Sequence, residues 1–412
     1  MRVLRRFLPW IAVAVGVLLA VVIGIRLLPV AVPVGVKVAD QFPSSGGAPQ
    51  AIAGAQISDA GPGSLVSATT MPQITRTLEG GNVEAARVVY RSTNGDTNTP
   101  TVVSGSVFVP KGAAPQGGWP VVSIGHGTVG IDGPCAPSLS DSLGGALIAV
   151  HLLTKQGYAV ALADYQGLGT KGVHPYPDSR TAGLNMIDAV RALRHTFPDV
   201  SDRWAAFGHS QGGGASWAAD EQAAGYAPEL HLVGAVAASP AADVSGIVLK
   251  AQYGTLTSDQ RPVIQAIIES LARIHPDLNR DDYRQGAGAK YWDVLTACTG
   301  PQVAQRSVAT KQLGQNDFAP RTPEAADRLR GLLEQWALPQ KPLSAPLSVW
   351  YGGADTYVDA DWTTAAIRRA CALGGDITIE FAPDKGHSQV DVTGQLKWLQ
   401  DRFDGKPAAN DC

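Results

Sequence analysis

The chain has 412 residues, of which 45% are hydrophobic and 17% charged, and its formal net charge is −3. This length allows one elaborated domain or two, and the near-neutral charge without a basic block argues against nucleic-acid binding. No CxxC pair, HExxH motif or P-loop occurs, so no metal site and no cofactor is expected.

The N-terminal segment, residues 1–26, has the pattern of a membrane anchor or an export signal. Arg2, Arg5 and Arg6 precede an apolar run over residues 7–25, close to the roughly 20 residues that span a bilayer. No small-x-small cleavage site follows this run closely, which favours an uncleaved anchor over a cleaved signal. The basic start keeps this end in the cytoplasm, so the remaining chain is predicted to lie outside the membrane.

Residues 27–71 are rich in Pro, Gly, Ala and Ser without a clear period, which predicts a linker and wrapping arm. A hairpin with strands at 86–91 and 101–110 follows. Strands and helices then alternate, as is typical of parallel strands joined by crossover helices. The predicted strands cover residues 121–125, 158–165, 203–209 and 230–238, and the predicted helices cover 143–156, 182–195 and the segment after residue 210.

The first strand of this alternation ends in Gly-His-Gly-Thr, residues 125–128. In esterases and lipases, a loop at this place supplies one N–H group to the oxyanion hole, and the residue after the nucleophile supplies the other. We therefore predict the backbone N–H groups of Thr128 and Gln211 as the two donors. GxGxxG spacings at 125–130 and 167–172 continue as loops rather than helices, which argues against a dinucleotide site.

Ser210 is the predicted nucleophile. It lies in the sequence Gly-His-Ser-Gln-Gly, residues 208–212, between an apolar strand and a stretch of small residues. Strand, tight turn and helix in this order form a nucleophile elbow. Because a serine hydroxyl is a weak nucleophile, the site also needs a base and an anion-stabilising pocket. His126 and His209 are interpreted as structural residues beside the nucleophile rather than as this base.

The alternation stops near residue 242 and resumes near residue 347, so residues 243–343 are predicted to form a helical cap. The cap would be inserted between strand six and the acid-bearing strand, and its strongest helices cover residues 262–274 and 325–338. Its apolar helices would either line an acyl-chain tunnel or hold the cap together, and the sequence leaves both open. The catalytic domain would then comprise residues 72–242 and 344–412.

Two late strands each run into a candidate catalytic residue. The strand at 347–351 leads through a glycine turn to Asp355, the predicted acid, and the strand at 376–381 leads to His387, the predicted base. The chain order of serine, acid and histidine is the order found in α/β-hydrolases. The rival acids, none of which directly follows a strand with a glycine turn, are Asp359, Asp361 and Asp384.

The four cysteines agree with an exported protein. Because Cys412 is the last residue, where a buried thiol has little to pack against, a crosslink is the better interpretation. The sequence permits three pairings of these residues. The predicted disulfide residues are Cys135, Cys298, Cys371 and Cys412.

Over residues 71–412 the chain resembles the secretory lipase family, the lipase A type of the α/β-hydrolase superfamily. The motifs that carry this resemblance lie at residues 125–128, 135–138, 164–170, 172–176, 208–212 and 386–387 and at the terminal cysteine. The resemblance implies an extracellular serine hydrolase of acylglycerols and other esters, with a mostly parallel sheet under a helical cap. It also implies Cys135–Cys298 and Cys371–Cys412 pairs, whereas Asp164 and His174 are interpreted as loop scaffolding.

The prediction is a serine ester hydrolase of the lipase or carboxylesterase type that forms an acyl-enzyme with Ser210, Asp355 and His387. Its partners would be a lipid or small-ester substrate and the membrane, reached through the N-terminal segment. The alternatives are an acyltransferase or short-chain esterase of the cell envelope, and an envelope-anchored binding protein without catalysis. Acyl length, acceptor alcohol and oligomeric state stay open.

Overall fold

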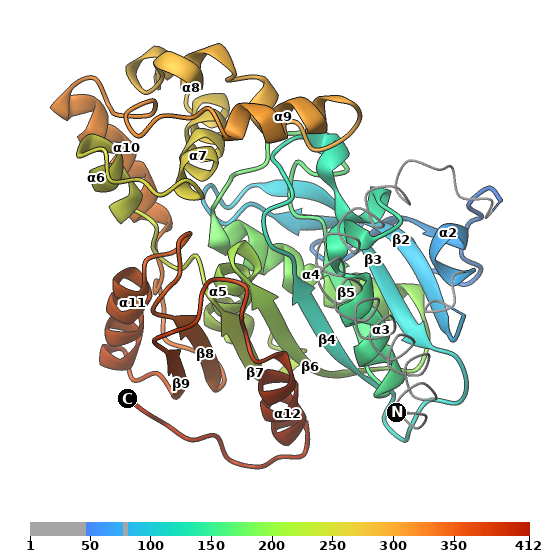
Figure 1. Ribbon diagram of the computed structural model, residues 1–412. Helices are drawn as coiled ribbons and strands as arrows, with labels where there is room; N and C mark the ends of the chain where they lie inside the picture. The colour runs from blue at the N-terminus through green and yellow to red at the C-terminus, as the bar shows by residue number, and fades with distance from the viewer. Residues whose placement is uncertain (1–46, 77–80) are drawn as a thin grey trace, which may run out of the picture.

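The computed structural model describes residues 47–76 and 81–412, which form a sheet with helices on both faces and a cap of further helices (Figure 1). The predicted anchor or export signal, residues 1–26, lies outside the described residues. Within the described part of the chain, no helix combines the length and the apolar character needed to cross a membrane.

The sheet has nine strands in the order β1-β2-β3-β5-β4-β6-β7-β8-β9. The pairs β1–β2, β2–β3 and β3–β5 are antiparallel, and every other pair of neighbours is parallel. The mostly parallel α/β sheet predicted from the alternation is therefore confirmed. The strands are β1 (Leu65–Thr70), β2 (Val83–Thr93), β3 (Pro100–Pro110), β4 (Trp119–Gly125), β5 (Ala159–Ala163), β6 (Val200–His209), β7 (His231–Ala238), β8 (Leu347–Gly352) and β9 (Ile377–Ala382).

Alternate residues of the central strands supply two separate cores, because successive side chains in a strand point to opposite faces. In β4, Val121 packs into the core under α4, α5 and α11, while Val122 and Ile124 pack into the core under α3 and α12. Both faces are covered, as parallel sheets require. These helices are α3 (Leu147–Lys155), α4 (Ser179–Thr196), α5 (Gln211–Tyr226), α11 (Ala360–Ala372) and α12 (Val392–Phe403).

Two predicted elements differ from the structure. Residues 65–70, predicted as part of the linker and wrapping arm, form the edge strand β1, because they pair with β2 over residues 86–90. The helix predicted over residues 143–156 is broken near its start, since Gly144 and Gly145 have φ values of 63° and 96°. Only Leu147–Lys155 is α-helical. Short helices that complete the fold are α2 (Pro72–Thr75) and the 3₁₀ turns at Gly133–Cys135, Pro137–Leu139, Leu143–Gly145, Arg280–Asp282 and Val294–Thr296.

The cap lies between β7 and β8 in the chain and covers one end of the sheet (Figure 1). It has its own hydrophobic core, in which Ile264 and Ile268 of α7 pack with Leu329 and Leu333 of α10. Most of this core comes from the cap, and Ile131 and Tyr176 of the sheet domain complete it. Its helices are α6 (Gly246–Gln252), α7 (Gln260–Ile274), α8 (Gly286–Lys290), α9 (Gln302–Thr310) and α10 (Pro323–Trp336).

Two disulfides join distant parts of the chain. Cys135, in the loop after β4, is bonded to Cys298 of the cap, and Cys371 of α11 is bonded to Cys412. This is the pairing that the family resemblance implies. The second bridge holds the C-terminal tail beside β9, where Asp411 N–H also donates to the carbonyl of Ile377 at 2.8 Å.

Candidate active site

Ser210 occupies a sharp turn between β6 and α5, with backbone angles φ 61° and ψ −121°. Residues other than glycine rarely adopt a positive φ. Ser210 is therefore held in a strained backbone conformation by its surroundings. A Cβ atom added to Gly208 would lie 1.9 Å from the carbonyl oxygen of Gly212, and one added to Gly212 would lie 1.9 Å from that of Gly125. The glycines of the motif therefore allow β4, β6 and α5 to approach closely around the serine.

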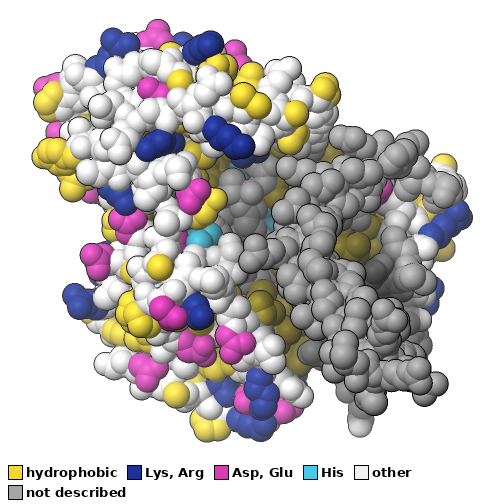
Figure 2. All heavy atoms as spheres, in the orientation of Figure 1, with side chains coloured by type: hydrophobic (Ala, Val, Ile, Leu, Met, Phe, Trp, Pro, Cys, Tyr) yellow, Lys and Arg dark blue, Asp and Glu magenta, His cyan; other side chains and the backbone are white. Residues whose placement is uncertain are grey.

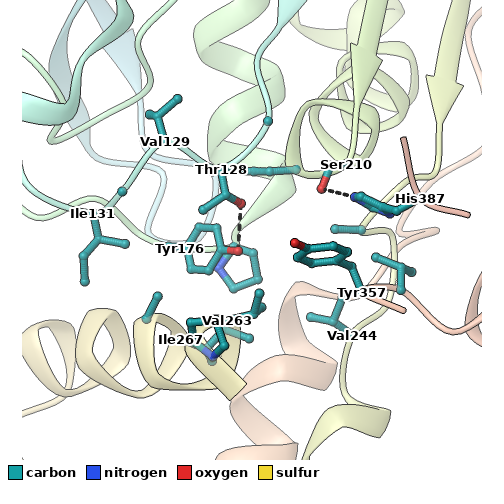
Figure 3. Close-up of a pocket in the computed structure, with 18 of the residues that line it drawn as sticks. Thr128, Val129, Ile131, Tyr176, Ser210, Val244, Val263, Ile267, Tyr357 and His387 are labelled. Atoms are coloured by element: carbon teal, nitrogen blue, oxygen red, sulfur yellow. Dashed lines mark hydrogen bonds between the residues drawn. The ribbon is translucent and has the colours of Figure 1, made fainter. Parts of the chain in front are cut away.

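Ser210, His387 and Asp355 form one chain of hydrogen bonds. His387 Nε2 lies 2.9 Å from Ser210 Oγ (Figure 3). On the other side of the ring, His387 Nδ1 lies 2.7 Å from Asp355 Oδ2. The other carboxylate oxygen, Asp355 Oδ1, accepts from the backbone N–H groups of Tyr357 at 2.8 Å and Val358 at 3.0 Å. Asp355 is thereby fixed with one oxygen facing the imidazole.

The three rival acids lie in other environments. Asp359 accepts from Lys250 at 2.8 Å, so its charge is paired with the cap helix α6. Asp361 is exposed in the first turn of α11. The side chain of Asp384 is 76% exposed, and its nearest cation is Lys385 at 3.6 Å. Among the four candidates, Asp355 alone is described in contact with His387.

The position of His387 depends on two residues that the sequence did not identify as functional. Its backbone carbonyl accepts from His209 Nε2 at 2.7 Å and from Ser239 Oγ at 2.9 Å. Burial lowers the pKa of His209. Because a carbonyl oxygen can only accept, Nε2 of His209 is the donor in this contact. His209 was interpreted as a structural residue, and the structure gives it that role at a specific atom. No local pattern indicates this contact, because 178 positions separate the two residues.

The predicted oxyanion residues Gln211 and Thr128 line the same cavity as Ser210, and Gln211 directly follows Ser210 in the chain. Gln211 is the first residue of α5, where backbone N–H groups have no partner within the helix. Its side-chain amide donates to His174 Nε2 at 3.0 Å, and burial lowers the pKa of His174 to about 3, so the ring remains a neutral acceptor. The hydroxyl of Thr128 lies 2.9 Å from that of Tyr176.

Further polar residues near the loop after β4 support the shape of that loop. Asp164 accepts from Ser104 Oγ at 2.6 Å and from the backbone N–H of Ser138 at 2.8 Å. The ring nitrogens of His126 lie 2.7 Å and 3.1 Å from the carbonyl oxygens of Gly127 and Asp164. Neither residue lines the cavity. Among the described residues, no group of three or more His, Cys, Asp or Glu side chains is arranged to hold a metal ion.

The cavity of about 410 Å³ above Ser210 lies between the sheet domain and the cap. Figure 2 shows a hollow between these two parts, with a histidine side chain visible in it. Val263 and Ile267 of α7 line the cavity (Figure 3). Ile267 also belongs to the cap core, together with Ile264 and Ile268. The residues of α7 therefore both line the cavity and pack in the cap core.

The cap is attached beside the cavity at several points. The Cys135–Cys298 bridge joins it to the loop after β4, and Arg273 of α7 forms an ion pair with Asp132 of the same loop at 2.7 Å. These contacts place the cap directly over the residues that flank Ser210.

A serine in a nucleophile elbow on a mostly parallel sheet, followed in the chain by an acid and a histidine after late strands, defines the α/β-hydrolase class. The model of the secretory lipase family matches residues 142–411, and the chain belongs to this family.

Comparison with known proteins gives relatives of this class at low identity. The chain is 26% identical over 351 residues to a Mycobacterium tuberculosis protein named as a probable inactive lipase, covering 79% of this chain and 75% of that protein. It is 28% identical over 348 residues to lipase 6 of Candida albicans, covering 74% of this chain and 70% of that lipase. The crystal structure of Candida antarctica lipase A in its closed state has the same fold, with a TM-score of 0.68 at 19% identity, covering 85% of this chain and 84% of the lipase.

Proposed function

We propose that this protein is a carboxylic ester hydrolase in which Ser210 is the nucleophile, His387 the general base and Asp355 the residue that orients the imidazole. One observation carries the proposal: two hydrogen bonds, of 2.9 Å and 2.7 Å, join the three side chains in the order the mechanism needs. The family and its lipase relatives support ester hydrolysis as the reaction class.

In the proposed mechanism, His387 Nε2 takes the proton of Ser210 as Oγ attacks the ester carbonyl. Asp355 holds the imidazole by Nδ1–H and stabilises its charged form. The backbone N–H groups of Gln211 and Thr128 stabilise the oxyanion. The alcohol then leaves with the proton from His387, and water activated by the same histidine hydrolyses the acyl-enzyme.

The proposed substrates are acylglycerols or other lipid esters. The apolar face of α7, with Val263 and Ile267, lines the cavity next to Ser210 and would contact an acyl chain. Chain-length preference is tested with p-nitrophenyl esters from acetate to palmitate, with and without a lipid interface. Preference for the shortest members would favour the short-chain esterase alternative, and product transfer to an added alcohol would favour an acyltransferase.

The first relative above is named as inactive, so a non-catalytic protein is the alternative to test directly. A fluorophosphonate probe labels a serine only where a base activates it. We expect labelling of Ser210, located by peptide mass spectrometry, and its loss in His387→Ala. A folded protein that resists the probe and hydrolyses none of the esters would overturn the proposal.

We propose further that the protein acts outside the cytoplasm. The family is a secretory one, and the two disulfides fit an oxidising compartment. Whether residues 1–26 act as an anchor or as a cleaved signal is tested by the N-terminal sequence of the mature protein and by its partition between membrane and medium. Intact Met1 in the membrane fraction would support the anchor.

A further inference from the structure

Arg306 of α9 lines the same cavity as Ser210. Among the described residues that form this cavity, it is the only one whose side chain carries a permanent charge. The other lining residues are apolar, hydroxyl-bearing, amide or histidine side chains and glycines. A cation next to a cavity that receives acyl chains costs desolvation energy unless an anion compensates it.

No acidic side chain within the described residues compensates this charge. The groups that act electrostatically on Arg306 are the two phenols of Tyr176 and Tyr357, with no Asp or Glu among them. Burial lowers the pKa of the guanidinium, as expected for a cation that lacks a counter-ion, although arginine stays protonated. The polar contact described for it is a hydrogen bond from Nη1 to the carbonyl of Ala297 at 3.1 Å.

This hydrogen bond holds the guanidinium in place without neutralising it. Ala297 precedes Cys298, which is bonded to Cys135 in the loop after β4. Arg306 is therefore fixed to the segment of the cap that is covalently tied to the loop beside Ser210. A guanidinium has five N–H donors, so a single carbonyl leaves most of them for another partner.

The two tyrosines place this cation close to the reacting groups. Figure 3 shows the hydroxyls of Tyr176 and Tyr357 pointing toward one another across the cavity. The ring of Tyr357 lies 4.8 Å from that of His387, and the hydroxyl of Tyr176 lies 2.9 Å from that of Thr128. The guanidinium of Arg306 and the hydroxyl of Tyr176 are suitable donors for an anionic oxygen group, whereas the hydroxyl of Tyr357 already interacts with the carboxylate of Asp259.

We propose that Arg306, with the hydroxyl of Tyr176, binds an anionic group of the substrate, a carboxylate or a phosphate within the same molecule as the ester. The preferred substrates are then negatively charged esters rather than neutral acylglycerols. This inference rests on the proposed esterase function and refines its substrate class. Arg306 is a specificity-determining residue in this account and takes no part in proton transfer.

The experiment compares charged and neutral esters of matched size. On the acyl side, the mono-p-nitrophenyl esters of adipic and suberic acid are compared with p-nitrophenyl hexanoate and octanoate. On the alcohol side, the butyryl ester of glycerol 3-phosphate is compared with monobutyrin by titration of released acid. The arm with the larger charged-to-neutral ratio of kcat/KM identifies where the anion lies relative to the ester.

In at least one arm, the wild type should favour the charged ester by on the order of tenfold, as expected for hydrogen bonds to a charged group. Arg306→Gln should abolish this preference, mainly through a higher KM for the charged ester. Arg306→Lys should keep part of it, because the charge remains while the planar fork is lost. The matched control is Lys311→Gln, which removes an exposed charge just after the same helix and should leave the ratio unchanged.

The outcomes separate this inference from the proposed function. Hydrolysis of the neutral esters with no preference for charge in either arm would overturn the inference and leave the esterase proposal standing. A charge preference that survives in Arg306→Gln would also overturn it, since another residue would then be responsible. Failure to hydrolyse any ester, together with resistance of Ser210 to the fluorophosphonate, would overturn both.

Discussion

The sheet domain and the cap meet at one cavity but hold their residues there by different means. Ser210, Asp355 and His387 follow β6, β8 and β9, and the hydrogen-bonded strands from β6 through β7 to β9 set their spacing. The cap residues belong to helices with a separate core. Strand ends are rigid and suit chemistry that tolerates little displacement, whereas a separately packed cap can vary its shape and what it admits.

The junction between the two parts contains buried carboxylates. Asp220 of α5 accepts from the backbone N–H groups of Ser344 and Ala345 at 2.8 Å and 2.9 Å, where the chain returns from the cap to β8. The neighbouring Glu221 accepts a hydrogen bond from the backbone N–H of Gln340 at 2.9 Å. The helix that begins at the nucleophile elbow therefore also holds the end of the cap, which makes the comparison of the two parts testable by mutation.

The largest effect is expected inside the sheet domain. Ser210→Ala should lower kcat/KM for p-nitrophenyl esters by on the order of 10⁴-fold or more, because the members of a triad act as a unit. Thermal unfolding monitored by circular dichroism should change little, since the hydroxyl lies at a turn outside the core clusters. Full activity of a folded variant would exclude Ser210 as the nucleophile.

The next largest effect is expected for Asp355→Asn, which should lower kcat by about 10⁴-fold. The amide neither orients the imidazole nor stabilises its charged form as the carboxylate does. The matched control is Asp384→Asn on the loop before His387, whose side chain is 76% exposed and which should retain nearly full activity. A sensitive Asp384 with a tolerant Asp355 would show that the acid has been assigned to the wrong residue.

Variants that lack one disulfide or the other should distinguish the contribution of the cap to activity from that of the sheet domain. Replacing either pair by serines should lower stability, by about 2–5 kcal/mol in the free energy of unfolding. The Cys135→Ser/Cys298→Ser protein should also lose kcat/KM, since this bridge ties the cap to the loop beside Ser210. The Cys371→Ser/Cys412→Ser protein is the control, and its kcat/KM should be retained at temperatures where it stays folded. Equal loss of activity in both would argue against a specific role of the cap bridge.

The smallest effect is a pH dependence at the junction. Burial raises the pKa of Asp220 to about 8 and that of Glu221 to about 7 in the folded protein. A carboxyl whose pKa is raised on folding binds its proton more tightly in the folded state, so stability falls as the pH rises from about 4 to about 8. In Asp220→Asn, the melting temperature should therefore decline less over this range than in the wild type.

The control for this measurement is Asp401→Asn on the surface helix α12. Salt bridges to Lys397 and Lys406 lower the pKa of Asp401 to about 2, so its titration lies below the tested range. Its melting curve should parallel that of the wild type between pH 5 and pH 8. An Asp220→Asn protein with the same slope as this control would show that Asp220 does not titrate in this window.

Much of the sheet domain could be predicted because neighbouring residues along the chain specify it. The alternating apolar strands from β4 onward, the glycines around Ser210 and the two late strands all have short-range patterns. The strand β1 could not be predicted, because Leu65–Thr70 becomes a strand only by pairing with β2. The break at Gly144 was missed because a single glycine is tolerated in a helical pattern, and its conformation is set by the surrounding loop.

The sequence by itself determined the order of the functional groups: an elbow serine, an acid after one late strand and a histidine after the next, with a long helical insertion before them. Only the tertiary structure decided how these groups are held and what faces them. His209 contacts the carbonyl of His387, 178 positions away in the chain. Arg306 lines the same cavity as Ser210, 96 positions away. Such contacts leave no periodic trace in the chain, because they depend on the packing of whole elements rather than on local conformational preference.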